Sequence, residues 1–290
     1  MHPWKVAARP ATLWAALTPV VLGSALAEAQ GVFRPGAMAA ALVVSLAMQI
    51  GVNIANDVAD AAKGADSEAR IGPPRAVASG LLTPRQAWVG TWAAFGVAGL
   101  AAIYLVAIAG WPVVAMGVAA VFAAVSYTSG PAYGYHGLGE LFVFVFFGLV
   151  GTVGTRFLHD KTAPSEAWVL GVVVGLLITA ILVANNLRDI ETDTGAGKHT
   201  LAVIAGRQAT RWLYAGCVLG AFAIVAVAAA TGALPGGTAL GLIVSPAALP
   251  LIRLALTEVA GPPLIRLLTG TSHLQGAFGF VAAVGLISIG

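Results

Sequence analysis

Charged residues are scarce in this chain of 290 residues. Lys, Arg, Asp and Glu make up 9% of it, whereas hydrophobic residues make up 59%. A water-soluble globular domain carries roughly 25% charged residues, so the composition excludes that class. Apolar runs of about 20 residues, enough to cross a bilayer as a helix, exclude the short alternating segments of a β-barrel. The sequence therefore predicts an all-α, polytopic membrane protein embedded in the lipid bilayer.

Cysteine is almost absent. The one cysteine, Cys217, lies in an apolar run. This excludes a disulfide framework and a cysteine metal site, and a small core residue is the expected role. The formal net charge of +3 says little by itself, because in a membrane protein the placement of positive charge matters more than its sum. No nucleic-acid partner is expected.

Nine segments are long and apolar enough to predict transmembrane helices. They form one domain over residues 1–290. The segments are 10–29, 36–58, 86–108, 111–128, 138–158, 166–188, 209–231, 236–256 and 272–289.

The placement of Lys and Arg predicts the orientation. If the N-terminus is cytoplasmic, that side of the membrane receives twelve of the fifteen basic residues, and the other side keeps only Arg34, Arg156 and Lys161. This asymmetry follows the positive-inside rule. A cleaved signal peptide ending near Ala27 is the alternative for the first apolar run, but a protein with many later spans does not need one.

Two acidic clusters each follow a strongly hydrophobic run. Carboxylates are costly near lipid, which makes a functional role the default interpretation. Seven of the twelve acidic residues lie in these clusters: Asp57, Asp60, Asp66, Glu68, Asp189, Glu191 and Asp193. Their duplication, with Asp189 lying 132 residues after Asp57, indicates a weak internal repeat of approximately 1–135 and 136–290.

Helical spacing arranges these clusters as stripes of oxygen ligands. Residues four apart share a helix face, so Asn185, Asp189 and Asp193 align. Asn53 aligns with Asp57 in the same way, and Asn56 with Asp60. Mg²⁺ accepts one or two carboxylates together with substrate phosphates, so two facing stripes predict two Mg²⁺ ions and a diphosphate between them. The alternative is an ordinary solvated helix end with salt bridges.

Basic residues of the neighbouring polar loops are candidates to bind the diphosphate. Arginine is suited to this role because its guanidinium forms a bidentate fork with phosphate oxygens. The positive-inside rule alone would also place basic residues here. The candidates are Lys63, Arg70, Arg75, Arg188 and Lys198.

A third region, Ser126 to Glu140, is rich in tyrosine and glycine. It contains Tyr127, Tyr133 and Tyr135, which could line an aromatic acceptor pocket or belong to an interfacial aromatic belt. Arg9, at the start of the first span, is a candidate to bind a substrate carboxylate, or else a residue that only sets topology.

At these motifs the chain resembles the UbiA superfamily of intramembrane prenyltransferases. Asn56-Asp57-x-x-Asp60 matches its NDxxD motif, and Asp189-x-x-x-Asp193 matches its DxxxD motif. The resemblance covers essentially the whole chain. Many members carry an Asp eight residues after the first Asn, where this chain has Gly64, so the nearest acid, Asp66, is a less direct candidate ligand.

The resemblance implies a fold and a set of roles. We expect nine helices around a central cavity, with a cytoplasmic cap and a lateral opening for the prenyl tail. The implied metal ligands are Asn56, Asp57, Asp60, Asp189 and Asp193, with Asp66 as a further candidate, and the four aspartates of the two motifs are the implied catalytic residues. The implied acceptor-binding residues are Arg9, Asn53, Tyr127, Tyr133, Tyr135, Asn185 and Asn186.

Within the superfamily the chain looks most like MenA-type enzymes. These transfer a polyprenyl group from polyprenyl diphosphate to 1,4-dihydroxy-2-naphthoate with decarboxylation, giving demethylmenaquinone in the prokaryotic inner membrane. Another acceptor, such as 4-hydroxybenzoate or homogentisate, is the enzyme alternative. A secondary transporter is the alternative from another class, but it would bury its ionisable groups near the membrane midplane rather than at helix ends.

Overall fold

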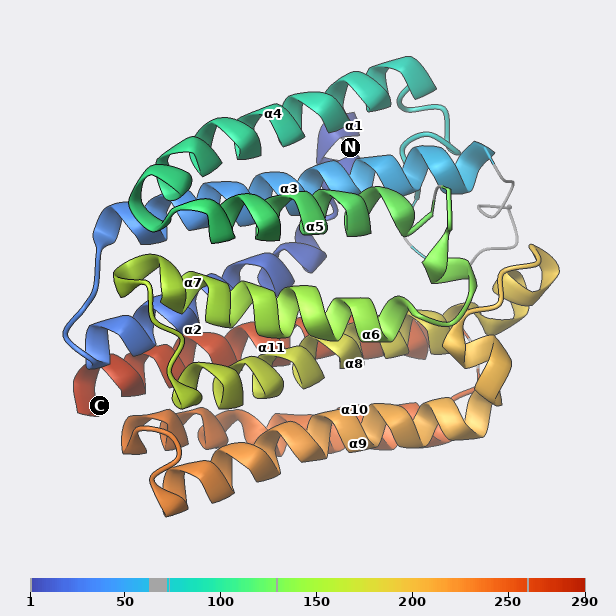
Figure 1. Cartoon of the computed structure of the whole chain (residues 1–290). Helices are drawn as coiled ribbons and strands as arrows, with labels where there is room; N and C mark the ends of the chain where they lie inside the picture. The colour runs from blue at the N-terminus through green and yellow to red at the C-terminus, as the bar shows by residue number, and fades with distance from the viewer. Residues whose placement is uncertain (1, 63–71, 73, 129, 260, 290) are drawn as a thin grey trace.

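The computed structural model describes residues 2–62, 72, 74–128, 130–259 and 261–289. Throughout these ranges every regular element is a helix, which confirms the all-α prediction. The long helices lie side by side in one bundle (Figure 1). The elements up to the middle of the bundle are α1 (Pro3–Ala8), η1 (Pro10–Thr12), α2 (Leu13–Ala29), α3 (Pro35–Ala62), α4 (Pro84–Ala109), α5 (Trp111–Ser126) and η2 (Tyr133–Tyr135).

The second half of the chain begins with a helix of mixed type. Here α6 (Gly139–Val143) continues through the π-helical turns of η3 (Phe144–Val150) into α7 (Gly151–Asp160). The elements that follow are α8 (Ser165–Gly195), α9 (Leu201–Thr231), the 3₁₀ segment η4 (Gly236–Ala247), α10 (Ala248–Thr257) and α11 (Pro262–Ile289).

Eight helical segments in the described ranges are long and apolar enough to cross a membrane. They correspond to eight of the nine predicted spans. The remaining prediction, 111–128, coincides with α5, which is apolar but has 16 residues and is therefore only about 24 Å long, against a hydrocarbon thickness of about 30 Å. The protein is an integral membrane protein.

Several helices extend beyond the predicted spans. The α8 helix continues to Gly195, so Asp189 and Asp193 belong to one continuous helix. The α9 helix begins at Leu201, where Thr200 caps it, and is interrupted at Gly206 with φ 78° and ψ 165°. These helices are longer than the predicted spans because hydropathy locates only the part of a helix that lies in lipid. Polar residues continue the helix beyond that part.

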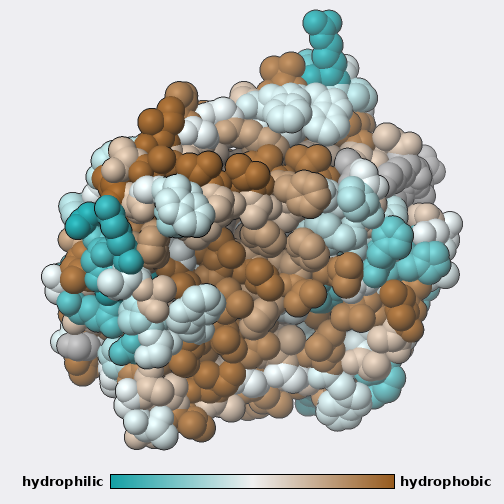
Figure 2. Space-filling view, in the orientation of Figure 1, coloured by the Kyte–Doolittle hydropathy of each residue, from teal (hydrophilic) through white to brown (hydrophobic). Residues whose placement is uncertain are grey.

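The α8 helix lies at the centre of the bundle. Most of its apolar residues are buried, and it packs against α9, η3 and α11. By contrast, α4 buries few residues and exposes large apolar ones such as Trp92, Leu100 and Ile103. Figure 2 shows mostly hydrophobic residues across the middle of one face, as expected for a surface in contact with lipid.

Glycines bring η3 and α8 into close contact. A Cβ atom added to Gly148 would lie 2.7 Å from the carbonyl oxygen of Gly171 and against the backbone of Gly175. Small residues allow such close backbone approach in membrane helix pairs. This contact holds η3, and the phenylalanines it carries, against the helix that bears the second acidic motif.

We predict that Gly148→Ala destabilises the protein by roughly 1–3 kcal/mol, because its methyl group would overpack the contact between η3 and α8. Thermal unfolding in detergent measures the effect. Gly99→Ala on α4 is the matched control, since nothing lies within 4 Å of the added methyl group. Equal unfolding temperatures for the two variants would contradict the proposed packing role.

Candidate active site

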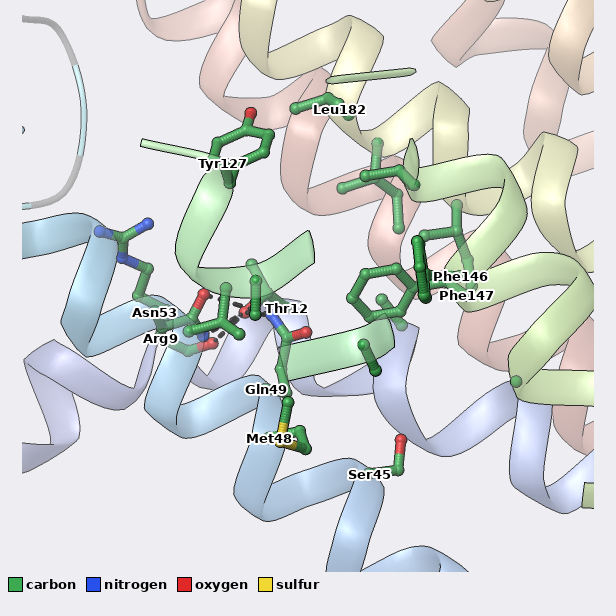
Figure 3. A pocket seen from close by; sticks show the side chains of 18 of the residues that line it. Arg9, Thr12, Ser45, Met48, Gln49, Asn53, Tyr127, Phe146, Phe147 and Leu182 are labelled. Carbon is green, nitrogen blue, oxygen red and sulfur yellow. Dashed lines mark hydrogen bonds between the residues drawn. The ribbon is translucent and has the colours of Figure 1, made fainter. Parts of the chain in front are cut away.

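A cavity of about 660 Å³ lies between α2, α3, α5, η3 and α8. Its lining changes from polar to apolar. Figure 3 shows Arg9, Asn53 and Gln49 near one another, with Phe146 and Phe147 across the cavity from them. Polar residues at one end of an otherwise apolar cavity are suited to a ligand with a charged head and a hydrocarbon tail.

The phenylalanines reach the cavity from a π-helical segment. Phe146 and Phe147 are consecutive residues of η3, and both line the cavity. A π-helical turn holds more residues than an α-helical one, and such turns are frequent at functional sites. Sequence reasoning did not identify these two residues, because hydropathy does not distinguish a π-helical turn from an α-helical one.

The first acidic motif lies at the C-terminal end of α3. Asp57 is fully buried, and its Oδ2 accepts hydrogen bonds from the backbone N–H groups of Ala76 at 2.8 Å and Val77 at 3.4 Å. Its Oδ1 is buried and has no hydrogen-bond partner among the described residues. The loop before α4 therefore holds one oxygen of this carboxylate, while the other is buried without a partner, and Asp57 does not line the cavity.

The connection between α5 and α6 also contacts this motif. Thr128 donates a hydrogen bond from its hydroxyl to Oδ1 of Asn56 at 3.0 Å, and the Tyr135 hydroxyl donates to Oδ1 of Asp60 at 2.9 Å. Asp60 lines the cavity, as do Tyr127 and Tyr133 of the same connection. This polar connection is thus part of the site.

The second acidic motif lies at the C-terminal end of α8. Arg188 binds Asp189 through two hydrogen bonds, Nε to Oδ1 at 2.6 Å and Nη2 to Oδ2 at 2.5 Å. One turn further on, Asp193 lies 3.9 Å from the ammonium group of Lys198. Each carboxylate of the predicted stripe therefore has a cation beside it.

Tyr135 links the two motifs. Its hydroxyl binds Asp60, while Lys198 lies over its ring at 5.0 Å from the ring centre. The backbone N–H of His199 donates to the Tyr135 carbonyl at 3.1 Å. The ends of α3 and α8 therefore meet across this tyrosine, and the two acidic clusters lie at the same end of the bundle.

Around Asn53 the cavity has a network of amides. Asn53 Nδ2 donates to the Ala8 carbonyl and to the Thr12 hydroxyl, both at 2.9 Å, and Gln49 Nε2 donates to Asn53 Oδ1 at 3.2 Å. Arg9 adopts a left-handed conformation with φ 50° and lines the cavity. Such conformations are uncommon outside glycine and occur often at functional sites.

Gln49, Thr12 and Thr128 were not among the predicted site residues. A signal for Gln49 was present, because it lies four residues before Asn53 and so extends the polar stripe of α3 by one turn. Thr128 could not be found in this way, since its partner Asn56 is 72 residues away in the sequence.

The remaining predicted acceptor residues differ in position. Asn185 lines the cavity, and its Oδ1 accepts from Arg188 Nη2 at 2.9 Å. Asn186 instead donates to Glu140 at 2.9 Å, and it does not line the cavity.

Tyr133 stacks on Phe142 with ring centres 3.8 Å apart. Burial raises the pKa of the Tyr133 phenol, which therefore stays protonated and able to donate a hydrogen bond.

Arg75 and Lys198, two of the predicted diphosphate-binding residues, line the cavity, as does Arg188. The other two, Lys63 and Arg70, lie outside the described residues, and so does the candidate ligand Asp66.

The chemistry of the donor set fits a hard cation held jointly with a phosphate. Of the four aspartates of the two motifs, Asp60 lines the cavity, whereas Asp57, Asp189 and Asp193 are buried beside it. Within the described ranges no three His, Cys, Asp or Glu side chains gather closely enough to enclose an ion by themselves. Mg²⁺ needs only one or two carboxylates, because water and substrate phosphate complete its shell. The Oδ1 atom of Asp57 is a candidate ligand, since a buried carboxylate oxygen without a partner is costly.

The chain is similar in sequence to known proteins along most of its length. The chain is 37% identical to the 1,4-dihydroxy-2-naphthoate octaprenyltransferase of Mycobacterium leprae over 98% of this chain and 96% of that protein. It is 41% identical to the enzyme of the same name from Mycobacterium tuberculosis over 73% of each chain. The corresponding enzyme of Escherichia coli is 37% identical over 77% of this chain and 75% of its own.

Solved structures share the fold. A UbiA homolog from Archaeoglobus fulgidus bound to DMAPP and Mg²⁺ superposes with a TM-score of 0.65 at 13% identity, over 97% of this chain and 99% of that one. A UbiA homolog from Aeropyrum pernix K1 gives a TM-score of 0.68 at 15% identity, over 93% of this chain and 96% of that one. The sequence model of the UbiA prenyltransferase family matches residues 16–261 of this chain. From its acidic motifs, its fold and its relatives, the chain belongs to the UbiA prenyltransferase family.

Proposed function

We propose that this protein transfers a polyprenyl group from polyprenyl diphosphate to 1,4-dihydroxy-2-naphthoate with loss of the carboxyl group. The single observation that carries the proposal is the meeting of two acidic helix ends, from α3 and α8, at the polar end of an apolar cavity. The acceptor follows from the relatives, which carry this activity in their names and match up to 98% of the chain.

The two acidic motifs would hold the diphosphate through Mg²⁺. Asp57 and Asp60 would bind one ion with Asn56, and Asp189 and Asp193 the other. When bound, Mg²⁺ supplies positive charge that neutralises the departing diphosphate. Three cations of the chain, Arg75, Arg188 and Lys198, line the same end of the cavity and would bind the remaining phosphate oxygens.

The apolar part of the cavity would hold the prenyl chain. Phe146 and Phe147, with Met48 and Met116, provide a hydrocarbon lining without charge. Such a lining excludes water, which would otherwise capture the allylic cation formed when the diphosphate leaves. The protein thus keeps the reactive carbon available for the aromatic ring.

The acceptor would bind between Arg9 and the tyrosines. Arg9 would pair with the carboxylate of dihydroxynaphthoate, while Asn53 and Asn185 would bind its hydroxyl groups. Tyr127 and Tyr133, whose rings meet edge to face with centres 5.4 Å apart, would contact the flat face of the ring.

The transfer would break one carbon–oxygen bond and one carbon–carbon bond and form one new carbon–carbon bond. The bond between the allylic carbon and the diphosphate oxygen breaks, and diphosphate keeps the electron pair. The aromatic ring forms a new carbon–carbon bond to the allylic carbon. The new bond forms at the ring carbon that bears the carboxylate, so the carboxylate leaves as CO₂, and the electron pair of its carbon–carbon bond returns to the ring and restores its aromaticity.

The active-site end of the bundle would face the cytoplasm. Both acidic motifs and twelve of the fifteen basic residues are assigned to that side by the charge asymmetry. Polyprenyl diphosphate and dihydroxynaphthoate would then reach the site from the cytoplasmic side of the inner membrane.

We predict that Asp57→Asn, Asp189→Asn and Asp193→Asn each lower kcat/KM for prenyl transfer by a factor on the order of 10² or more. Each removes a charge that would hold the cation stabilising the leaving group. Product formation by detergent-solubilised protein is the measurement, with thermal unfolding to verify that each variant is folded.

Glu191→Gln is the matched control for these variants. Glu191 lies on α8 between Asp189 and Asp193, but it is largely exposed and pairs with Arg207. Its loss should change kcat/KM by less than about threefold, since exposed ion pairs contribute little. Activity near wild type in all three aspartate variants would refute the assigned metal site.

The acceptor is tested by supplying purified protein with a set of prenyl diphosphates and one aromatic acid at a time, with and without Mg²⁺. Mass spectrometry should detect a prenylated, decarboxylated product from 1,4-dihydroxy-2-naphthoate only when Mg²⁺ is present. Products from 4-hydroxybenzoate or homogentisate in place of dihydroxynaphthoate would assign the protein to another acceptor within the family.

A further inference from the structure

Arg188 is bound to Asp189, one of the proposed metal ligands. Two guanidinium nitrogens contact the two carboxylate oxygens at 2.6 and 2.5 Å. Both residues are buried, with 5% of Arg188 and 6% of Asp189 exposed. This is a bidentate, charge-assisted pair in a largely dry environment, which is the strongest form of arginine–carboxylate contact.

The pair affects how Asp189 would meet a metal ion. The guanidinium takes one lone-pair position of each carboxylate oxygen, which leaves fewer positions for a cation. It also places a positive charge against the carboxylate, which repels a divalent cation. In this conformation Asp189 is therefore neutralised by an internal counter-ion rather than open to Mg²⁺.

Arg188 also has an unused donor. Its Nη1 is buried and has no hydrogen-bond partner within the described part of the chain. The side chain lines the cavity, and Nη2 is further held by Asn185 Oδ1 at 2.9 Å. A planar fork of donors can bind phosphate oxygens in the same bidentate manner as carboxylate oxygens. Arg188 can therefore exchange one anion for the other.

We propose that Arg188 is a positioning residue that neutralises Asp189 in the empty site and transfers to the diphosphate when substrate binds, releasing Asp189 to the metal. This inference rests on the proposed function, because it requires diphosphate and metal to share the site. Metal binding at the second motif then depends on diphosphate, and each ligand strengthens the binding of the other.

A neighbouring ion pair, between Arg207 of α9 and Glu191 of α8, provides a contrast. Arg207 contacts Glu191, but 65% of the Glu191 side chain is exposed. Water screens that pair, and an exposed ion pair holds its partners weakly. Removal of Arg207 changes the net charge at this end of the bundle by the same amount as removal of Arg188. Arg207→Gln is therefore a matched control for a general electrostatic effect.

The test uses the full chain in detergent and two titrations. The first measures Mn²⁺ binding without diphosphate, by the paramagnetic resonance signal of free Mn²⁺. The second measures binding of inorganic pyrophosphate to protein saturated with Mn²⁺, by calorimetry. We expect Arg188→Gln to bind Mn²⁺ about tenfold more tightly than wild type and pyrophosphate about tenfold more weakly. Arg207→Gln should change both constants by less than about twofold.

The opposite effects of Arg188→Gln on Mn²⁺ binding and on pyrophosphate binding distinguish this role from a structural one. A variant that only disturbs the fold would weaken both titrations, and that result would overturn the proposal, as would unchanged Mn²⁺ binding. In an Asp189→Asn background, Arg188→Gln should no longer tighten Mn²⁺ binding, and a persisting gain would also contradict the proposal.

Arg188→Lys covers the case in which the glutamine variant does not fold. Lysine keeps the charge but cannot contact both carboxylate oxygens, so Mn²⁺ binding should tighten about threefold and pyrophosphate binding should weaken. Wild-type values in both titrations would overturn the proposal. If the proposal about Arg188 fails but the wild-type protein still transfers the prenyl group, the proposed function stands. Absence of prenyl transfer by the wild-type protein would refute the proposed function itself.

Discussion

The site depends on keeping carboxylates charged at the end of an apolar bundle. A carboxylate near lipid must find hydrogen bonds or a cation, because water is scarce there. Asp57 takes backbone N–H groups, Asp60 takes the Tyr135 hydroxyl, and Asp189 takes Arg188. Each partner comes from a different part of the chain or from the helix itself. These contacts draw the polar loops over the ends of α3 and α8, and so form the polar end of the cavity.

The rest of the bundle positions the acidic motifs and forms the apolar walls that exclude water from the cavity. The α8 helix lies at the centre, where its glycines hold η3 close and its last turns carry the second motif. Next to it, η3 directs Phe146 and Phe147 toward the cavity. The α8 helix and the adjacent η3 thus contribute to both the charged end and the apolar wall of the cavity. This arrangement suits a substrate in which a diphosphate is joined to a hydrocarbon chain.

The helices and part of the candidate site could be predicted from the sequence, but only where spacing within one helix determines which residues lie together. Apolar runs located the helices, and intervals of four residues placed Asn53 with Asp57 on one face of α3. Contacts between distant segments left no such signal, as with Tyr135 and Asp60, which are 75 residues apart. Salt bridges at this helix end were one alternative, but the specific pairing of Arg188 with Asp189 was not identified, since adjacent helical residues are not expected to face each other. Only the folded geometry shows that a predicted diphosphate ligand already holds a predicted metal ligand.

The central claim is that both acidic motifs bind one diphosphate through metal at the polar end of the cavity. The most direct measurement is a structure of the protein with Mn²⁺ and an unreactive thio-analogue of polyprenyl diphosphate, with the metal located by anomalous scattering. We predict metal peaks about 2.1 Å from carboxylate oxygens of Asp57 or Asp60 and of Asp189 or Asp193, and the prenyl chain beside Phe146 and Phe147. Metal bound to neither motif, or a prenyl chain outside the cavity, would contradict it.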